Sequence, residues 1–232
     1  MSYNYKKLFG NREIVIFDID GTLVSTIPLH IDCSREAIRK VTGLNVKKDE
    51  EITRHFGKTA TMCISGILHD QGINPESKIV KKILKVWKKI ILQKIRKLDE
   101  KTVIPGILPL LTKLKKEKKI ILSITGNPKA TGESILHNTK IRKFFDDCIY
   151  STHKYKGKKI LQRRHMLELA FERAQIGSQK RIPKSRVIVV GDAAVDISAA
   201  YEAKFDSIAV GTGPHTKEKI MKEKPTFWVD HF

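Results

Sequence analysis

The chain has 232 residues, of which 41% are hydrophobic, so it can bury a core and is not a disordered chain. No run approaches the roughly 18 apolar residues of a membrane helix, and the first ten residues lack the apolar stretch of a signal peptide. We therefore expect a soluble, cytoplasmic protein with no membrane partner. Its three scattered cysteines suit a reducing compartment better than a disulfide framework or a zinc site.

Charge leaves two interpretations open. Lys and Arg number 45 against 25 Asp and Glu, a formal net charge of +20, and such an excess can indicate nucleic-acid binding. The lysines are nevertheless spread through segments with apolar residues between them, such as 81–89 and 113–119, and no zinc-finger, basic-zipper or RNA-recognition signature is present. We favour solvated helix faces that also draw in anionic substrates, with nucleic acid as the alternative partner.

The first predicted element is a buried strand at 14–17 that runs directly into two carboxylates, Asp18 and Asp20, and then a Gly-Thr turn. Residues two apart in a strand share a face, so both carboxylates lie at the carboxyl end of the strand, where open α/β sheets place ligands. A simple Asx turn would explain an isolated Asp-x-Asp-Gly equally well. A carboxylate pair at this position suggests metal chemistry.

Residues 25–101 carry no convincing strand pattern. Helices are predicted at 30–42, 49–56, 59–71 and 75–98, with glycine and proline between them. This stretch has the form of an inserted α-helical cap domain, residues 25–101. The remaining segments, 1–24 and 102–232, then form one core domain.

The core segment alternates between strands and helices. Predicted strands are 120–124, 148–150, 186–190, 207–210 and an edge strand at 226–229; predicted helices are 106–118, 129–137, 161–175 and 195–203. Because crossovers between parallel strands are almost always right-handed, this order predicts an α/β fold with a doubly wound parallel sheet.

Two further polar signatures follow predicted strands. Thr125, Gly126 and Asn127 offer a hydroxyl and backbone N–H groups at a helix start, which can cradle an anion or merely cap the helix. Asp192 and Asp196 follow the strand at 186–190, and their carboxylates can serve as hard oxygen ligands for a divalent cation such as Mg²⁺. The alternative for Asp196 is stabilisation of a helix N-terminus.

Together, the sequences DIDGT at 18–22, SITGN at 123–127 and GDAAVD at 191–196 resemble motifs one, two and four of the haloacid dehalogenase (HAD) superfamily, in the branch of phosphoglycolate phosphatase and β-phosphoglucomutase. The resemblance implies a Rossmann-like core with a helical cap. It also implies that Asp18 is the nucleophile, that Asp20 is the general acid and base, and that Thr125, with Gly126 and Asn127, binds the phosphoryl group. The implied Mg²⁺ site consists of Asp18, Asp20 through its backbone carbonyl, Asp192 and Asp196.

The third motif departs from the family pattern. Many relatives supply a phosphate-binding cation from a Lys-Pro-x-Pro segment, which this chain lacks. Other branches begin the corresponding helix with Arg, which places Arg163 in the catalytic and phosphate-binding role. Lys159 is the second choice, and Lys158 or Arg164 stay open.

The cap would supply substrate recognition, and Arg54 and Lys58, in a basic turn, are the candidate contacts. His30 matches a position in some sugar phosphomutases. The retained acidic residues disfavour dehalogenation, so we expect a Mg²⁺-dependent phosphatase that hydrolyses a small phosphorylated metabolite through an aspartyl-phosphate. The alternatives are a sugar-phosphate mutase and a basic, non-catalytic nucleic-acid-binding protein on the same scaffold; substrate and oligomeric state cannot be read from the sequence.

Overall fold

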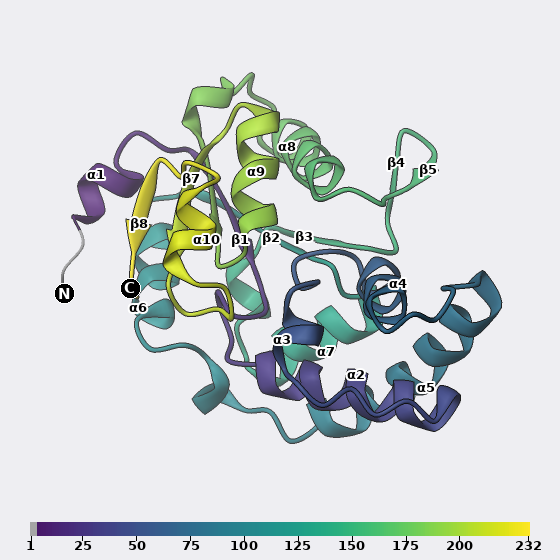
Figure 1. Ribbon diagram of the computed structural model, residues 1–232. Coiled ribbons are helices and arrows are strands. Elements are labelled where there is room, and N and C mark those ends of the chain that lie inside the picture. Colours follow the sequence, from purple (N-terminus) through teal and green to yellow (C-terminus); the bar gives the residue numbers. More distant parts are fainter. Residues whose placement is uncertain (1–3) are drawn as a thin grey trace.

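The computed structural model describes residues 4–232, and its centre is a six-stranded sheet (Figure 1). The strands of this sheet are β1 (Ile14–Asp18), β2 (Ile120–Thr125), β3 (Asp147–Tyr150), β6 (Val187–Gly191), β7 (Asp206–Val210) and β8 (Phe227–Val229). A separate hairpin is formed by β4 (Lys154–Tyr155) and β5 (Lys158–Lys159).

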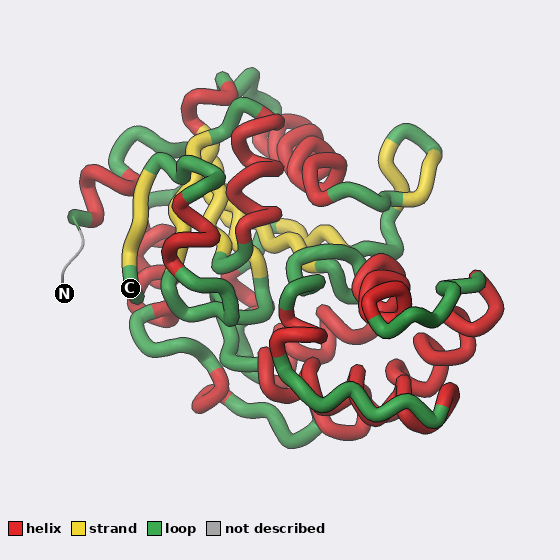
Figure 2. The backbone as a smooth tube through the Cα atoms, in the orientation of Figure 1, coloured by secondary structure: helices red, strands yellow, loops and turns green. Residues whose placement is uncertain are grey.

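Helices occur before and between these strands (Figure 2). They are α1 (Tyr5–Phe9), α2 (Ile27–Thr42), α3 (Glu50–Thr53), α4 (Ala60–Asp70), α5 (Ser77–Ile95), α6 (Ile107–Lys116), α7 (Lys129–Asn138), α8 (Arg163–Ser178), α9 (Ala194–Ala203) and α10 (Lys217–Met221).

The sheet order is β3-β2-β1-β6-β7-β8, and every neighbouring pair is parallel. The chain therefore winds outward from β1 in both directions, which confirms the predicted doubly wound α/β fold. Register pairs Asp18 with Ile124 across β1 and β2, and Phe17 with Val190 across β1 and β6. The neighbouring strands β2, β1 and β6 consequently end at the same edge of the sheet.

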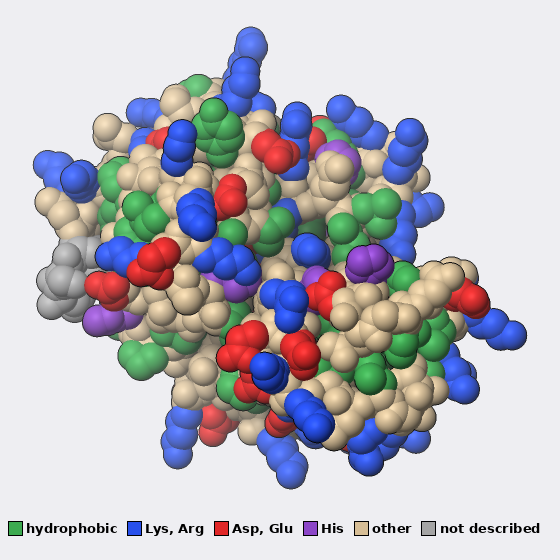
Figure 3. Space-filling view, in the orientation of Figure 1, with side chains coloured by type: hydrophobic (Ala, Val, Ile, Leu, Met, Phe, Trp, Pro, Cys, Tyr) green, Lys and Arg blue, Asp and Glu red, His purple; other side chains and the backbone are tan. Residues whose placement is uncertain are grey.

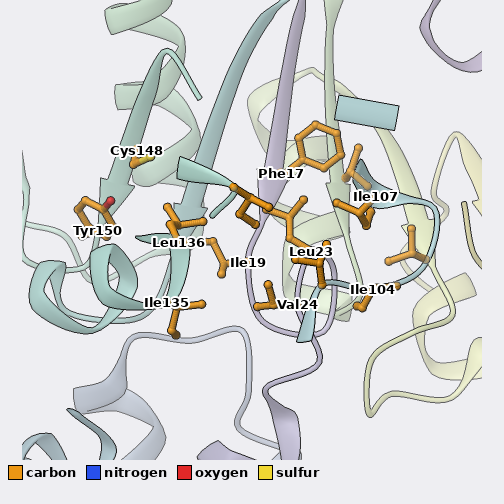
Figure 4. Packing of buried hydrophobic residues seen from close by; sticks show 14 of the residues in the cluster. Phe17, Ile19, Leu23, Val24, Ile104, Ile107, Ile135, Leu136, Cys148 and Tyr150 are labelled. Carbon is orange, nitrogen blue, oxygen red and sulfur yellow. The ribbon is translucent and has the colours of Figure 1, made fainter. Parts of the chain in front are cut away.

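Both faces of the sheet are covered by helices, as expected for strands that are buried on both sides. Ile14 and Ile16 of β1 pack in a cluster with residues of α8 and α9. Val15 and Phe17, on the other face, pack in a second cluster with residues of α6 and α7, part of which is shown in Figure 4. This second cluster continues without a break into α2, α4 and α5.

Helices α2 to α5 all lie between β1 and β2 in the sequence and form the helical part at the lower right of Figure 1. The long helix α5 buries Ile83, Trp87 and Ile91 and exposes the lysines of 81–89, as its apolar spacing requires. These helices match the predicted insertion, while the domain limits at 25 and 101 remain a prediction. The predicted core segment 1–24 begins outside the described residues.

Several element bounds differ from prediction. Helix α2 begins at Ile27 rather than at 30, because Pro28 is tolerated in the first helical turn. The segment 49–56 is helical only over Glu50–Thr53 and then turns, and α8 spans Arg163–Ser178 rather than 161–175. The short helices α1 and α10 and the hairpin were missed, since elements of two to five residues carry almost no periodicity.

Lys and Arg side chains are scattered over the face shown in Figure 3, with Asp and Glu side chains among them. None of the helices within residues 4–232 combines the length and the apolar character needed to cross a bilayer.

Candidate active site

Asp18 is the last residue of β1 and is 7% exposed. Its Oδ1 atom accepts a hydrogen bond from Nη2 of Arg163. Its Oδ2 atom has no hydrogen-bond partner among residues 4–232, and the side chain lines a cavity. One oxygen of this buried carboxylate is therefore fixed and the other is available to react.

Three carboxylates gather at this edge of the sheet. One oxygen from each of Asp18, Asp192 and Asp196 lies within 4.8 Å of the others, and all three residues are buried. Burial raises the pKa of Asp18 well above its ordinary value, with repulsion from Asp196 adding to the shift and Arg163 opposing it. Burial and the neighbouring Asp196 likewise raise the pKa of Asp192 to about 7. Both shifts report uncompensated negative charge.

Arg163 begins α8 and points into this cluster, with its side chain only 2% exposed. Its Nε donates to Oδ1 of Asp196 at 2.7 Å while Nη2 reaches Asp18. Within residues 4–232 it is the one basic side chain in ion-pair contact with the three carboxylates, so a single positive charge faces three ionisable acids. Buried carboxylates with excess negative charge are the donor set that a divalent cation such as Mg²⁺ prefers, and the site fits such an ion.

Thr22 positions the carboxylate of Asp192. Its Oγ1 donates to Oδ1 of Asp192 at 2.7 Å, and both residues are buried. Asp196, in the first turn of α9, accepts a hydrogen bond from the backbone N–H of Ala193 at 3.3 Å through Oδ2. The helix-stabilising role considered for Asp196 is thus present, and it coexists with membership of the carboxylate cluster.

Asp20 points away from the cluster and towards the helical insertion. Its Oδ1 accepts hydrogen bonds from Thr26 Oγ1 at 2.6 Å and from His30 Nε2 at 2.8 Å. Its Oδ2 accepts from Asn127 Nδ2 at 2.6 Å and from Thr125 Oγ1 at 3.3 Å. Burial would raise the pKa of Asp20, but attraction to His30 and these hydrogen bonds lower it below its ordinary value. Two carboxylates two residues apart therefore have opposite shifts.

The loop after β2 closes a third side of the site. Thr125 is 1% exposed, and its Oγ1 accepts a hydrogen bond from the N–H of Asn127 at 3.1 Å. Gly126 contacts the helical insertion directly, and its carbonyl accepts a hydrogen bond from the N–H of Ala60 at 3.1 Å. A Cβ on Gly126 would lie 2.1 Å from the carbonyl oxygen of Lys58. Glycine here permits the insertion to contact the strand end.

These groups border a cavity of about 80 Å³ between the sheet edge and helices α2, α4 and α5. The sheet edge contributes Asp18, Asp20, Thr125, Gly126, Asn127, Asp192, Ala193 and Asp196. The helical insertion contributes Ile27, His30, Ser34, Phe56, Gly57, Lys58, Ala60, Cys63, Ile64, Leu84 and Trp87.

The candidate residues from the sequence divide into two groups. The structure brings together Asp18, Asp20, Thr125, Gly126, Asn127, Asp192, Asp196, Arg163, His30 and Lys58 around the cavity. Lys158 and Lys159 are instead exposed on β5, and exposed Arg164 pairs with Glu168 at 2.9 Å. Arg54 is also exposed, pairs with Asp70 at 3.4 Å and does not line the cavity. Of the four basic candidates for the third motif, Arg163 alone reaches the carboxylates.

Sequence reasoning missed several residues of the site. Thr22 lies inside the DIDGT stretch, so its spacing from Asp18 could have identified it. Thr26 holds Asp20 from the first turn of the insertion, where no motif marks it. Trp87 and Ser34 reach the cavity through helix packing, and on an amphipathic helix such residues cannot be distinguished from ordinary core residues.

Comparison with known proteins gives concordant results. A phosphoglycolate phosphatase of Pseudomonas savastanoi pv. phaseolicola is 25% identical over 236 residues, covering 97% of this chain and 80% of the relative. A phosphoglycolate phosphatase of Synechococcus elongatus is 21% identical, covering 94% and 92%. The crystal structure of a hydrolase from Pseudomonas syringae has the same fold, with a TM-score of 0.80, 17% identity and coverage of 95% and 94%.

The family profile described as haloacid dehalogenase-like hydrolase matches residues 13–204, a span that begins just before β1 and ends just after α9 and so contains the whole carboxylate cluster. The sequence resemblance, the doubly wound sheet and this match agree. The chain belongs to the haloacid dehalogenase-like hydrolase family.

Proposed function

We propose that this hydrolase is a Mg²⁺-dependent phosphatase that acts on a small phosphate monoester through an aspartyl-phosphate at Asp18. The observation that carries the proposal is the cluster of Asp18, Asp192 and Asp196 beside a free Oδ2 of Asp18. The phosphatase names of the two relatives support the same reaction class. In this proposal residues 25–101 form the cap domain, and residues 1–24 and 102–232 form the core.

In the first step Oδ2 of Asp18 attacks the phosphorus, and the bond between phosphorus and the leaving oxygen breaks as Asp20 gives that oxygen a proton. The products are the free alcohol and an acyl-phosphate on Asp18. In the second step Asp20 takes a proton from water, the water oxygen attacks the phosphorus, and inorganic phosphate leaves with Asp18 restored. Direct attack of water on the ester is thus replaced by two displacements at phosphorus, each of which has a lower barrier.

The hydrogen bonds to Asp20 favour its ionised form, which is the form required to accept the proton from water. Proton donation in the first step requires release of some of these bonds. In this proposal Arg163 orients Oδ1 of Asp18 and offers a positive charge to the phosphoryl group. Thr125 and the N–H groups after it would hold phosphoryl oxygens, with the N–H of Asn127 released from Thr125 Oγ1. Asp18, Asp192, Asp196 and the backbone carbonyl of Asp20 would hold Mg²⁺, which when bound supplies positive charge to the phosphoryl oxygens.

The test is hydrolysis of an aryl phosphate with Mg²⁺ and with a chelator, for the parent protein and for Asp18→Asn. We expect turnover that depends on Mg²⁺ and falls on the order of 10⁴-fold in the variant, because a carboxamide cannot form the acyl-phosphate. Asp32→Asn, on the exposed face of α2, is the matched control. Retained turnover in Asp18→Asn would exclude the aspartyl-phosphate, and turnover in the chelator would exclude the metal requirement.

A further inference from the structure

Apolar side chains form most of the cap side of the cavity. Its walls are formed by Ile27, Phe56, Ile64, Leu84 and Trp87, which come from α2, the turn after α3, α4 and α5. The lysines at 81–89 of α5 are exposed to solvent, and none of them lines the cavity. A leaving group that extends from the phosphorus towards the cap would therefore contact mainly apolar side chains.

The two basic residues on this wall are poorly placed to bind a second anionic group. His30 already donates to Asp20 through Nε2 and has its ring stacked on Trp87, with centroids 6.0 Å apart. Phe56 contacts the same ring edge-on at 6.4 Å. Lys58 lines the cavity but is exposed to solvent, so an ion pair with its ammonium would be a weak, solvated one. A carboxylate or second phosphate in the cavity would thus have no enclosed cation as a partner, which is costly.

The wall also contains a buried hydroxyl that has no hydrogen-bond partner among the described residues. Ser34 lies one helical turn after His30, is 6% exposed, and its Oγ makes no hydrogen bond with residues 4–232. Cys63, a further polar residue of the wall, is already a donor, since its thiol lies 2.9 Å from the carbonyl of His55. Burial raises the pKa of Cys63 to about 12, which keeps it neutral. Buried hydroxyls normally have a partner, so Ser34 offers one donor and acceptor to a bound molecule.

The cavity also limits size. A water needs roughly 10–15 Å³ of such volume, so about 80 Å³ holds on the order of five to eight waters. The phosphoryl group occupies part of this space, because the carboxylate cluster lines the same cavity. What remains accommodates a leaving group of a few non-hydrogen atoms.

We propose that the leaving group is a small, uncharged alcohol whose carbon surface packs on Trp87 and Leu84, and that a single polar atom on it pairs with Ser34. This inference rests on the proposed phosphatase function and names its substrate class. It makes Ser34, Leu84 and Trp87 the residues that determine specificity.

Binding of non-hydrolysable phosphonates, measured by calorimetry in the presence of Mg²⁺, tests the substrate class without relying on turnover. 3-Methylbutylphosphonate and 3-phosphonopropionate have the same number of non-hydrogen atoms and differ in whether the far end is an isopropyl group or a carboxylate. We expect 3-methylbutylphosphonate, whose far end is uncharged, to bind at least about tenfold more tightly, because the carboxylate of the other compound would be buried without a partner. Equal binding, tighter binding of the carboxylate, or binding of neither compound would overturn the inference.

Variants test the named residues. Leu84→Lys places an ammonium in the wall and should reverse the order of the two phosphonates. Ser34→Ala should weaken 3-hydroxypropylphosphonate about fivefold and leave n-butylphosphonate unchanged, since one hydrogen bond is lost. Lys82→Ala, on the exposed side of α5 away from Leu84 and Trp87, is the control that should change neither affinity. An unchanged order in Leu84→Lys, or equal weakening of both compounds by Ser34→Ala, would count against these assignments.

Hydrolysis of the corresponding phosphate esters separates the two proposals. Absence of turnover with every ester, combined with the expected order of phosphonate binding, would contradict the phosphatase and retain the substrate class. Turnover that prefers phosphoglycolate over 3-methylbutyl phosphate would retain the phosphatase and overturn the substrate class. Loss of that preference in Lys58→Met would then assign the carboxylate to Lys58.

Discussion

The two sides of the cavity are built on different principles. On the sheet side, Asp192, Asp20 and Arg163 are each fixed by hydrogen bonds from defined donors or to defined acceptors, and all are set by the ends of parallel strands or the first turns of helices. On the cap side, Leu84 and Trp87 make apolar contacts, and the hydroxyl of Ser34 makes no hydrogen bond with residues 4–232. Polar groups with fixed partners tolerate little change, while an apolar wall can be reshaped.

The difference assigns separate tasks to the two sides. Substitutions at the sheet edge should lower activity towards every substrate, because they disturb groups that act on the phosphoryl group itself. Substitutions in the cap wall should change the order of preference among substrates and leave the chemistry in place. The predictions below test this division.

Among substitutions that keep the nucleophile Asp18, the largest effect is expected for Arg163→Met. Removal of the guanidinium leaves Asp18 and Asp196 buried without their shared cation, which should destabilise the protein by about 3–5 kcal/mol and lower kcat/KM on the order of 10³-fold. The measurements are urea unfolding and turnover of two dissimilar esters. Arg164→Met, at the next position and exposed, is the matched control. A loss confined to one ester would contradict the division between sheet edge and cap.

Asp192→Asn should separate stability from activity. We expect Mg²⁺ affinity to fall at least about 100-fold, with a corresponding loss of turnover, because a carboxylate ligand is removed. The amide oxygen can still accept the hydrogen bond from Thr22, so the fold should be preserved. Calorimetric Mg²⁺ titration measures the affinity, and a parent-like affinity would remove Asp192 from the metal site.

The same variant has a defined dependence on pH. The pKa of Asp192 is raised to about 7 from 3.8, so without metal the folded state holds its proton longer than the unfolded state, and its contribution to stability is lost as pH rises from about 4 through 7. The asparagine side chain of the variant does not ionise, so the variant does not lose stability in this way as pH rises. In a chelator, the variant should therefore melt above the parent at pH 8, by roughly 2–4 °C for each kcal/mol recovered. Lower melting of the variant at pH 8 would contradict the assigned shift.

Most of the fold could be predicted from the sequence because its signals are long and local. Buried parallel strands are continuous apolar runs, and the strand beginning at Ile14 and that beginning at Ile120 were found within one residue of their observed ends. The helix at 49–56 was overpredicted because its polar residues suit a helix, whereas His55 and Phe56 instead turn to pack in the insertion. Helix propensity depends on the local sequence and therefore could not predict this tertiary packing of His55 and Phe56.

The site was predictable where one short stretch carries several of its groups. DIDGT and GDAAVD each place two carboxylates, and strand register then brings Asp18 and Asp192 together. The sequence placed Arg163 first but left Lys159, Lys158 and Arg164 open, because the exposure of the two lysines on β5 and of Arg164 on α8 depends on how the hairpin and the helix fold. The cap wall could not be predicted from local sequence either, because it forms only when α2, α4, α5 and the turn after α3 pack together.

Gly57→Ala should have a smaller effect that acts on the contact between cap and core. Gly57 has φ of +85°, and a Cβ there would lie 2.2 Å from Cγ1 of Val195, next to the carboxylate loop. The substitution should push the turn off the core and raise KM about tenfold for every ester, because Gly57 lines the cavity in which the ester is proposed to bind. Gly72→Ala is the control: its φ is +72°, but nothing lies within 4 Å of the added Cβ, so it should lose about 1 kcal/mol of stability and keep its KM. Equal KM changes in both variants would trace the effect to backbone strain alone.

The smallest effect concerns His215, which joins the cap to the core from the loop after β7. Its Nε2 donates to the carbonyl of Thr53 at 3.2 Å, and its Nδ1 accepts from the N–H of Ala194 at 3.3 Å, an arrangement that requires the neutral ring. Burial and the nearby Lys219 lower the pKa of His215, so its contribution to stability is complete above the ordinary value of 6.5 and is lost as pH falls through the lower folded value. His215→Asn should therefore be about 1 kcal/mol less stable than the parent at pH 7.5, with the gap closing towards pH 5. Urea unfolding across this range measures the gap, with exposed His69→Asn as the control; a gap that stays constant would show that His215 packs between cap and core without responding to pH.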